Sequence, residues 1–365
     1  MDQEIDQELA KRMLVEGATM IFLDVPVGTE FGIDLKSWNT GDKFKGVKMI
    51  PPGIHIIHYS TIGKYGDISP KVSFMHNFKK HEFLVKKWDL DAEDVSSECI
   101  KNEEIERFKA NLFELDKFLG PYPFDTWPQW KKLSNHLSES LLERLNPESG
   151  LIRSALELVK GEPKIERRSR GRTIEEKEEE LLPKLVPKEG SNIRMTPLPE
   201  AYPEGCSPAE ITMHSMDSTY TLEKIISQFN NEMDLLGELQ FLFISFLVGQ
   251  SLEAMESWRT LFRTLCKVRS GLVRRRGLYS AFLKVLETQL IFIPEDFLVD
   301  IVASNNVIYS SLRDLFRSMK EESVVEPRLK CEAEHLKERL THKFGWDFED
   351  LEEEVGDEAP VIVDL

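Results

Sequence analysis

The stretch that decides the fold of the N-terminal half is GVKMIPPGIHIIHYS, residues 46–60. Two runs of apolar and β-branched residues flank a Pro-Pro-Gly turn, and turns of this kind separate strands. The second run contains His55 and His58, whose spacing raises the question of a metal site. Successive side chains of a strand point to opposite faces, so residues three apart diverge. The sequence therefore predicts a strand with one histidine on each face and no metal bound by the pair.

Similar segments lie on both sides of this stretch, after a short helix expected over residues 5–15. They are ATMIFLD, EFGID, KVSFMHNF and FLVKKWD, and turn sequences rich in Gly, Pro, Asn and Asp separate them. Short strands punctuated in this way predict an antiparallel sandwich or small barrel up to about residue 90. His76 and His81 flank one of the predicted turns, where two surface imidazoles are favoured over a shared site.

Helical spacing of apolar residues begins after the predicted strands. It predicts helices over 105–119 and 127–146, and a third short helix is expected over 148–160. Trp127 and Trp130 lie three apart at a helix start, a spacing typical of core packing. Residues 1–160 are thus predicted to form one β-rich domain with flanking helices.

Residues 161–205 differ in composition, because they carry many charges of both signs and almost no aromatic residues. Such a segment buries too little surface to offset its ordering entropy and reads as a disordered linker. Its basic block RRSRGR, around Ser169, is a candidate localisation patch or phosphorylation site, with a solvated linker the favoured interpretation.

Order is predicted to resume at Ser207, where Pro208 and Glu210 complete a capping box with proline at the first helical position. Only helices are expected over residues 206–345. Their predicted ranges are 208–229, 233–248, 251–269, 277–292, 295–304, 306–319 and 327–343. The predicted fold class is therefore α+β, with a β-sandwich-like N-terminal domain followed by an all-α domain.

Composition excludes several functional classes. The net charge of −17 argues against a general nucleic-acid binder or a protein that docks on anionic lipid. The four cysteines include no CxxC pair, so a zinc ribbon is excluded and reduced thiols in an intracellular protein are expected. The N-terminus lacks the apolar region of a signal peptide, and no run reaches the roughly 20 apolar residues of a membrane span. No nucleotide-binding, nucleophile or metalloprotease motif is present, so no catalytic residue, cofactor or metal ligand is predicted.

Residues 346–365 form an acidic tail with nine carboxylate side chains and no Lys or Arg. The tail ends in VIVDL, whose alternating β-formers suit strand addition to the sheet edge of another protein. The candidate partner-binding residues are Trp346, Phe348, Val361, Ile362 and Val363, and a frayed C-terminus is the alternative. The basic run Arg274–Arg276 is a second candidate contact for an acidic partner, although such runs are usually solvated.

Several stretches together resemble the splicing-factor family named for a1–alpha2 repression, the assembly chaperones of the U5 small nuclear ribonucleoprotein. They include LAKRMLVEGATMIFLDVPVGTEFGID, FKGVKMIPPGIHIIHYS, LGELQFLFISFLVGQSLEAMESW and HKFGWDF. The resemblance runs from near residue 8 to residue 348, interrupted by the charged linker. It implies a β-sandwich-like N-terminal domain and a C-terminal helical domain similar to VHS modules.

The resemblance also implies a function and a partner. Family members bind the large U5 core protein, of the Prp-eight type, through its RNase H-like and MPN-like domains. This binding delays binding of the U5 RNA helicase, of the Brr-two type, and premature binding of RNA. Release is linked to phosphorylation of the family member. The family tail joins sheets of the partner, and its members act in the cytoplasm and the nucleus.

The leading hypothesis is thus a non-enzymatic splicing factor that binds no membrane and makes no direct nucleic-acid contact. The alternative is a VHS-like peptide-binding adaptor in membrane traffic, against which the lack of a basic lipid-facing surface argues. A metal-dependent or sugar-acting enzyme on the β-rich domain is the third hypothesis.

Overall fold

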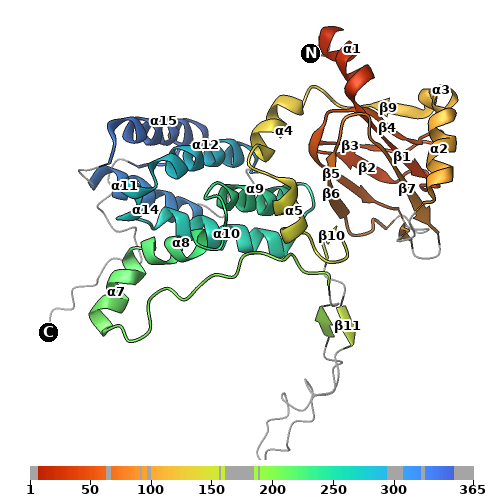
Figure 1. The fold of residues 1–365 in the computed structure, drawn as a ribbon. Coiled ribbons are helices and arrows are strands. Elements are labelled where there is room, and N and C mark those ends of the chain that lie inside the picture. The colour runs from red at the N-terminus through yellow and green to blue at the C-terminus, as the bar shows by residue number, and fades with distance from the viewer. Residues whose placement is uncertain are drawn as a thin grey trace, which may run out of the picture.

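The computed structural model describes residues 7–62, 67–90, 93–96, 100–155, 158–160, 185–187, 190–293, 307–321 and 325–348. It is an α+β protein, as predicted, with a β-rich N-terminal part beside an all-helical C-terminal part (Figure 1). Helix α1 (Gln7–Glu16) precedes the first strand, in agreement with the expected helix at 5–15.

One sheet of the N-terminal part has the strand order β8-β7-β1-β4-β9. Its strands are β1 (Ala18–Leu23), β4 (Gly46–Ile50), β7 (Phe83–Asp89), β8 (Asp94–Val95) and β9 (Leu119–Pro121). The sheet is mixed, because β1 pairs with β7 and β4 with β9 in parallel. The sequence indicated only antiparallel pairing, since turn signals between neighbouring segments say nothing about partners joined by long connections.

The second sheet has the order β10-β6-β5-β2-β3 and is antiparallel throughout. Its strands are β2 (Glu30–Ile33), β3 (Lys36–Asn39), β5 (Gly53–Ser60), β6 (Val72–Phe78) and β10 (Ile152–Arg153). The predicted segment 53–60 is the strand β5, at the middle of this sheet. A further pair, β11 (Leu158–Lys160) and β12 (Leu185–Pro187), is antiparallel.

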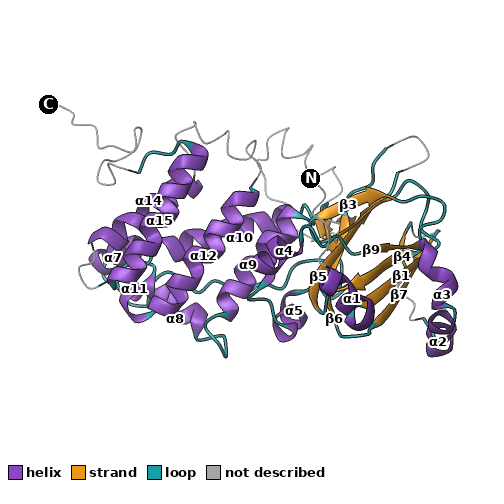
Figure 2. Ribbon diagram, turned by 90° about the horizontal axis from the view of Figure 1, so that it is seen from above, coloured by secondary structure: helices purple, strands orange, loops and turns teal. Residues whose placement is uncertain are grey.

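The two sheets enclose a core rich in aromatic side chains. Phe22 and Trp88 of the first sheet meet Phe31 and Tyr59 of the second, with ring centroids 5.5 to 5.8 Å apart. Helices α2 (Asn102–Ala110) and α3 (Leu112–Leu115), followed by the 3-10 turn η1 (Asp116–Phe118), lie at the outer side of the first sheet (Figure 2).

The remaining helices form the other part of the molecule (Figures 1 and 2). They are α4 (Trp127–Ser134), α5 (Glu139–Leu145), α7 (Pro208–Met216), α8 (Thr219–Ile226), α9 (Asp234–Leu247), α10 (Leu252–Cys266), α11 (Gly271–Arg274), α12 (Arg276–Phe292), α14 (Val307–Glu321) and α15 (Pro327–Phe344). Helix α9 is buried on all sides from Leu235 to Phe246, and most of its residues are apolar.

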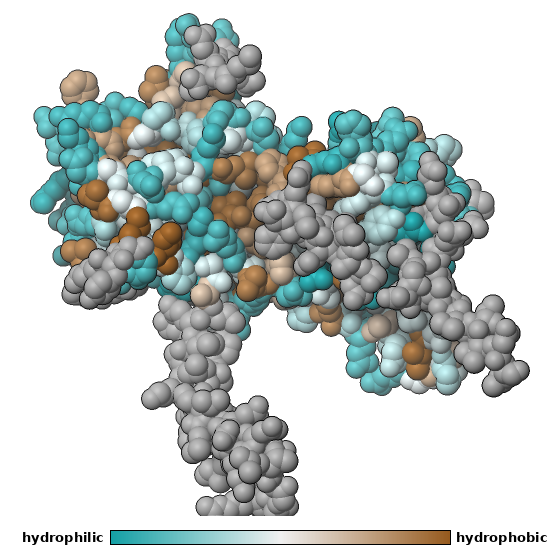
Figure 3. Space-filling view, turned by 180° about the vertical axis from the view of Figure 1, so that it is seen from behind, coloured by the Kyte–Doolittle hydropathy of each residue, from teal (hydrophilic) through white to brown (hydrophobic). Residues whose placement is uncertain are grey.

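A single apolar core joins this helical part to the second sheet. It contains Ile56 and Met75 from the sheet, Trp130 from α4 and Leu141 from α5, together with most of the buried residues of the C-terminal helices. Seen from the side opposite to Figure 1, hydrophobic residues also gather at the surface between the two parts (Figure 3). Helices α4 and α5, which we predicted within the N-terminal domain, thus share a core with the C-terminal helices.

Several details differ from the sequence-based prediction. The helix expected over 127–146 is divided into α4 and α5. The short helix expected over 148–160 does not form, because Gly150 has a left-handed backbone with φ of 71° and Ile152–Arg153 pairs with β6. The helix expected over 208–229 is divided into α7 and α8 at Asp217, whose carboxylate binds the backbone N–H of Thr219. Within the predicted linker, Ile193 and Thr196 are buried. The expected helix at 295–304 lies outside the described residues.

Among the residues that the structure describes, no helix combines the length and the apolar character that crossing a membrane requires.

Candidate partner-binding site at the root of the C-terminal tail

The tail leaves the molecule from the end of helix α15. Gly345 ends this helix in the left-handed conformation, with φ of 68°, and its N–H donates to the carbonyl of Thr341. Only glycine adopts this conformation without strain, which explains the abrupt turn of the chain. We call residues 345–348 the tail root.

Both aromatic residues of the tail root are buried. Trp346 and Phe348 are 6% and 1% exposed. Trp346 stacks on Phe344 at 4.7 Å between ring centroids, and Phe348 packs edge-on against Phe316 of α14 at 5.1 Å. Both rings also contact Tyr309, which lies two turns earlier on α14. The two residues are thus part of the helical core.

Hydrogen bonds from α14 also fix the backbone of the tail root. The hydroxyl of Tyr309 donates to the carbonyl of Asp347, and the guanidinium of Arg313 donates to the same carbonyl at 3.4 Å. Arg313 also donates to the Tyr309 hydroxyl at 3.2 Å. The tail therefore starts from a fixed point on α14. Val361, Ile362 and Val363, the other predicted contact residues, lie outside the described residues.

The histidines of β5 have separate structural roles. His55 is buried, with Nδ1 at 2.6 Å from a carboxylate oxygen of Asp34 and Nε2 at 2.8 Å from the carbonyl of Pro51. Asp34 also accepts from the hydroxyl of Tyr122 at 2.5 Å and from the N–H of Ile56 at 3.1 Å. Burial raises the pKa of Tyr122 well above its usual value, so its hydroxyl stays a donor. This network joins β5 to the turn after β2 and to the segment after β9.

His58 is buried beside Gly32 on the neighbouring strand β2, where a Cβ atom would lie 2.1 Å from the imidazole ring. Within the described part of the chain its Nδ1 has no hydrogen-bond partner, and burial lowers the pKa of His58 to about 4. The ring is therefore neutral at physiological pH. Among the described residues, no three His, Cys, Asp or Glu side chains are placed to hold a metal ion.

The other candidates from the sequence have separate structural surroundings, and His81 is exposed. His76 binds Glu82 at 2.7 Å, while His81 takes a left-handed turn conformation with φ of 59°. Trp130 is a core residue, as predicted, and its Nε1 donates to the carbonyl of Ile54 at 2.9 Å. Trp127 is partly buried and packs against the same core.

The basic run Arg274–Arg276 is engaged within the helical part. Arg275 forms ion pairs with Glu223 at 2.6 Å and Glu232 at 2.9 Å. These contacts lower the pKa of Glu223 and raise that of Arg275 above its usual value. Arg276 reaches Glu326 at 3.6 Å. Since Arg275 already has two acidic partners, the run offers less free positive charge than its sequence suggests.

Sequence reasoning missed the polar contacts that hold α4 and α5 against α9. Glu238 of α9 is 1% exposed, yet it pairs with Arg144 of α5 at 2.8 Å and accepts from the N–H and hydroxyl of Thr196. Gln240 accepts from the N–H of His136 and donates to the carbonyl of Lys132. The only available signal was that Glu238 and Gln240 interrupt an otherwise apolar helix.

Comparison with known proteins is consistent along the whole chain. A family model described as the AAR2 N-terminal domain matches residues 16–147, and one described as the AAR2 C-terminal repeat region matches residues 195–349. The chain is 41% identical to "Protein AAR2 homolog" of Mus musculus and 40% identical to that of Homo sapiens, over 99% of this chain and 97% of each relative. It is 32% identical to the Caenorhabditis elegans homolog, over 95% of this chain and 99% of that protein. The chain belongs to the AAR2 family.

Proposed function

We propose that this protein is a non-enzymatic assembly chaperone of the U5 small nuclear ribonucleoprotein. The observation that carries the proposal is membership of the AAR2 family over nearly the full chain, with both family models matched. The side chains of His55, Asp34 and Glu238 support this proposal, because they are engaged in structural hydrogen bonds.

The proposed partner is the large U5 core protein of the Prp-eight type, bound through its RNase H-like and MPN-like domains. Occupying these domains excludes the Brr-two type helicase and RNA until the chaperone is released. Such a mechanism requires two ligands that compete for one surface. The net charge of −17 supports it, since an acidic protein is complementary to a basic RNA-binding surface and is itself unsuited to nucleic acid or anionic lipid.

Within this function, the tail adds a strand to a sheet of the partner through Val361, Ile362 and Val363. Trp346 and Phe348 contribute indirectly, because they fix the tail root on α14 rather than face the partner. A segment that starts from a fixed point loses less freedom when it binds, which favours affinity. Release by phosphorylation, and passage between cytoplasm and nucleus, belong to the same proposal.

The experiment is a competition between the purified full chain and the helicase for the immobilised large U5 core protein. We expect the two to displace one another, and simultaneous binding of both would contradict the proposal. In fractionated cells, we expect this chain to co-purify with the core protein from the cytoplasm. A smaller fraction of the core protein should carry it in the nucleus.

The role of the tail is tested separately with proline substitutions. Alternate residues of a strand direct their N–H groups to the same edge, and proline has no N–H. Of the variants Val361→Pro and Ile362→Pro, one should weaken partner binding by roughly tenfold more than the other. Ile362→Ala is the matched control: it shortens the side chain but keeps the backbone N–H, so it should weaken partner binding less than the more damaging proline variant. Equal binding by all three variants would remove strand addition from the mechanism but leave the competition result standing.

A further inference from the structure

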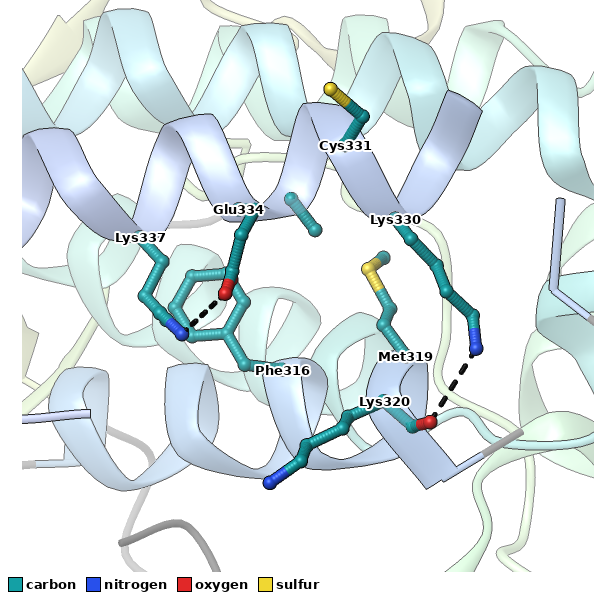
Figure 4. Close-up of a pocket in the computed structure, with 8 residues that line it drawn as sticks. Phe316, Met319, Lys320, Lys330, Cys331, Glu334 and Lys337 are labelled. Carbon is teal, nitrogen blue, oxygen red and sulfur yellow. Dashed lines mark hydrogen bonds and ion pairs between the residues drawn. The ribbon is translucent and has the colours of Figure 1, made fainter. Parts of the chain in front are cut away.

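A groove lies between helices α14 and α15, with a volume of about 380 Å³ (Figure 4). Phe316 and Met319 of α14 and Ala333 of α15 form its apolar floor. The groove is also lined by Lys320 of α14 and by Lys330 and Lys337 of α15. Lys330 and Lys337 are seven residues apart, so they lie on one face of α15. We call this the α14/α15 groove.

The groove is positively charged in a protein that is otherwise acidic. Lys337 is paired with Glu334 at 2.6 Å. Within the described part of the chain, Lys320 and Lys330 have no carboxylate partner, and Lys330 contacts only the carbonyl of Lys320, at 3.4 Å. An apolar floor beside two ammonium groups without counter-charges fits a short peptide that carries both apolar and acidic side chains.

The tail root leads toward this groove. Trp346 contacts Tyr309, and two residues later Phe348 contacts Phe316, so the chain runs along α14 in the direction of Lys320. Phe316 is itself part of the groove floor. On a helix the four residues from Phe316 to Lys320 advance by about 6 Å. The last described residue of the chain, Phe348, therefore contacts a residue of the groove floor.

We propose that the α14/α15 groove binds residues 351–355 of the same chain, which read LEEEV. Leu351 and Val355 contact the apolar floor, and the three glutamates between them face Lys320 and Lys330. Leu351 is three residues beyond Phe348, a reach of about 10 Å for an extended chain. Because the segment is tethered so closely, its effective concentration at the groove is on the order of millimolar, which favours it over a separate acidic peptide.

The consequence is a second point of attachment for the tail. Residues 356–365, including the candidate contact strand, then begin at the groove rather than at Phe348. This inference does not rest on the proposed function, since groove and occupant belong to one chain. It is tested without any partner protein.

The test is carbodiimide cross-linking of the full chain, which joins amines to carboxylates in direct contact, with the linked peptides identified by mass spectrometry. Mixing ¹⁴N- and ¹⁵N-labelled protein separates links within a chain from links between chains. We expect Lys320 or Lys330 to be joined to Glu352, Glu353 or Glu354 within single chains. The Lys337–Glu334 pair, 2.6 Å apart, is the internal control.

Two double variants make the test specific. Leu351→Ser with Val355→Ser removes the apolar contacts and should lower the yield of the groove links roughly fivefold. Val361→Ser with Val363→Ser is the matched control and should leave it unchanged. The Lys337–Glu334 link should persist in both, showing that α15 is intact.

Three results would overturn the proposal. The glutamates could link equally to exposed lysines of the β-rich part, such as Lys43 and Lys101. Both double variants could lower the yield equally. Links found only between chains would make a second copy the occupant of the groove.

Discussion

At the scale of single residues, the buried imidazole of His58 makes the stability of the fold depend on pH. Its pKa is lowered to about 4 in the folded protein, from an ordinary value of 6.5, because burial disfavours the charged ring. The unfolded chain therefore binds a proton more readily than the folded one. The contribution of His58 to stability is complete above pH 6.5 and is lost as the pH falls toward 4.

We expect the free energy of unfolding to fall by about 2 kcal/mol more between pH 7 and pH 5 in the unchanged protein than in His58→Leu. Urea unfolding at the two pH values measures this difference. His335→Gln, at a side chain that is 73% exposed, is the control and should keep the full pH dependence. Parallel pH profiles for the unchanged chain and His58→Leu would show that His58 does not cause the effect.

The Asp34 network gives a second prediction at this scale. Asp34→Ala leaves the hydroxyl of Tyr122, Nδ1 of His55 and the N–H of Ile56 without their acceptor, so we expect a loss of about 3–5 kcal/mol in unfolding free energy. Tyr122→Phe removes one donor, leaves Asp34 its other two, and should cost about 1 kcal/mol. Denaturant titration of both variants tests the ranking, and similar losses would contradict it.

At the scale of elements, the close approach of α9 to the α4–α5 connection depends on a glycine. A Cβ atom on Gly237 would lie 2.4 Å from the backbone oxygen of His136 and 2.5 Å from a methyl of Leu141. For Gly277 of α12, no atom of the residues that the structure describes lies within 4 Å of such a Cβ. The two glycines thus occupy helices in opposite steric surroundings.

We expect Gly237→Ala to destabilise the protein by about 1–3 kcal/mol, because the new methyl group must displace backbone. Gly277→Ala, the matched control, should be neutral or stabilising by up to about 1 kcal/mol, because alanine favours a helix. Thermal unfolding followed by circular dichroism measures both changes. A gain in stability for Gly237→Ala would mean that α4 and α5 do not pack here as described.

The elements also show what could be predicted from sequence. The strand at GIHIIHYS and helices such as α9 and α15 follow from local periodicity and turn residues, and they were predicted close to their observed bounds. The parallel pairing of β1 with β7 could not be predicted, because strand partners far apart in sequence leave no local pattern. The burial of Trp346 and Phe348 was missed for a similar reason, since the acidic residues after them suggested a solvated tail.

At the scale of the whole molecule, the shared core determines how the two parts behave when the chain is cut. Predicted domain boundaries at residues 160 and 206 divide the sequence by composition, and they remain a prediction. The packing unites Ile56, Trp130 and Leu141 with the helices after residue 206. We therefore infer that this packing can hold the two parts together without the covalent connection.

We expect a protease site placed between residues 165 and 180, outside the described residues, to give two fragments that co-elute in gel filtration. They should separate only in denaturant, because the contacts of Glu238, Gln240 and the apolar core remain intact. Gel filtration of cut and uncut protein, followed by denaturing electrophoresis, checks this. Elution of the fragments as two separate peaks would show that the shared core is too weak to join them.

The buried carboxylate of Glu238 has a practical consequence for experiments on this protein. If residues 195–348 were expressed alone, Arg144 would be missing and the face of α9 beside Leu141 would be open to water. Such a fragment would bind other proteins non-specifically through this exposed apolar surface. A pull-down with it would therefore recover proteins that do not bind the intact chain. Interaction mapping should therefore use point variants of the intact chain and not isolated N- or C-terminal fragments.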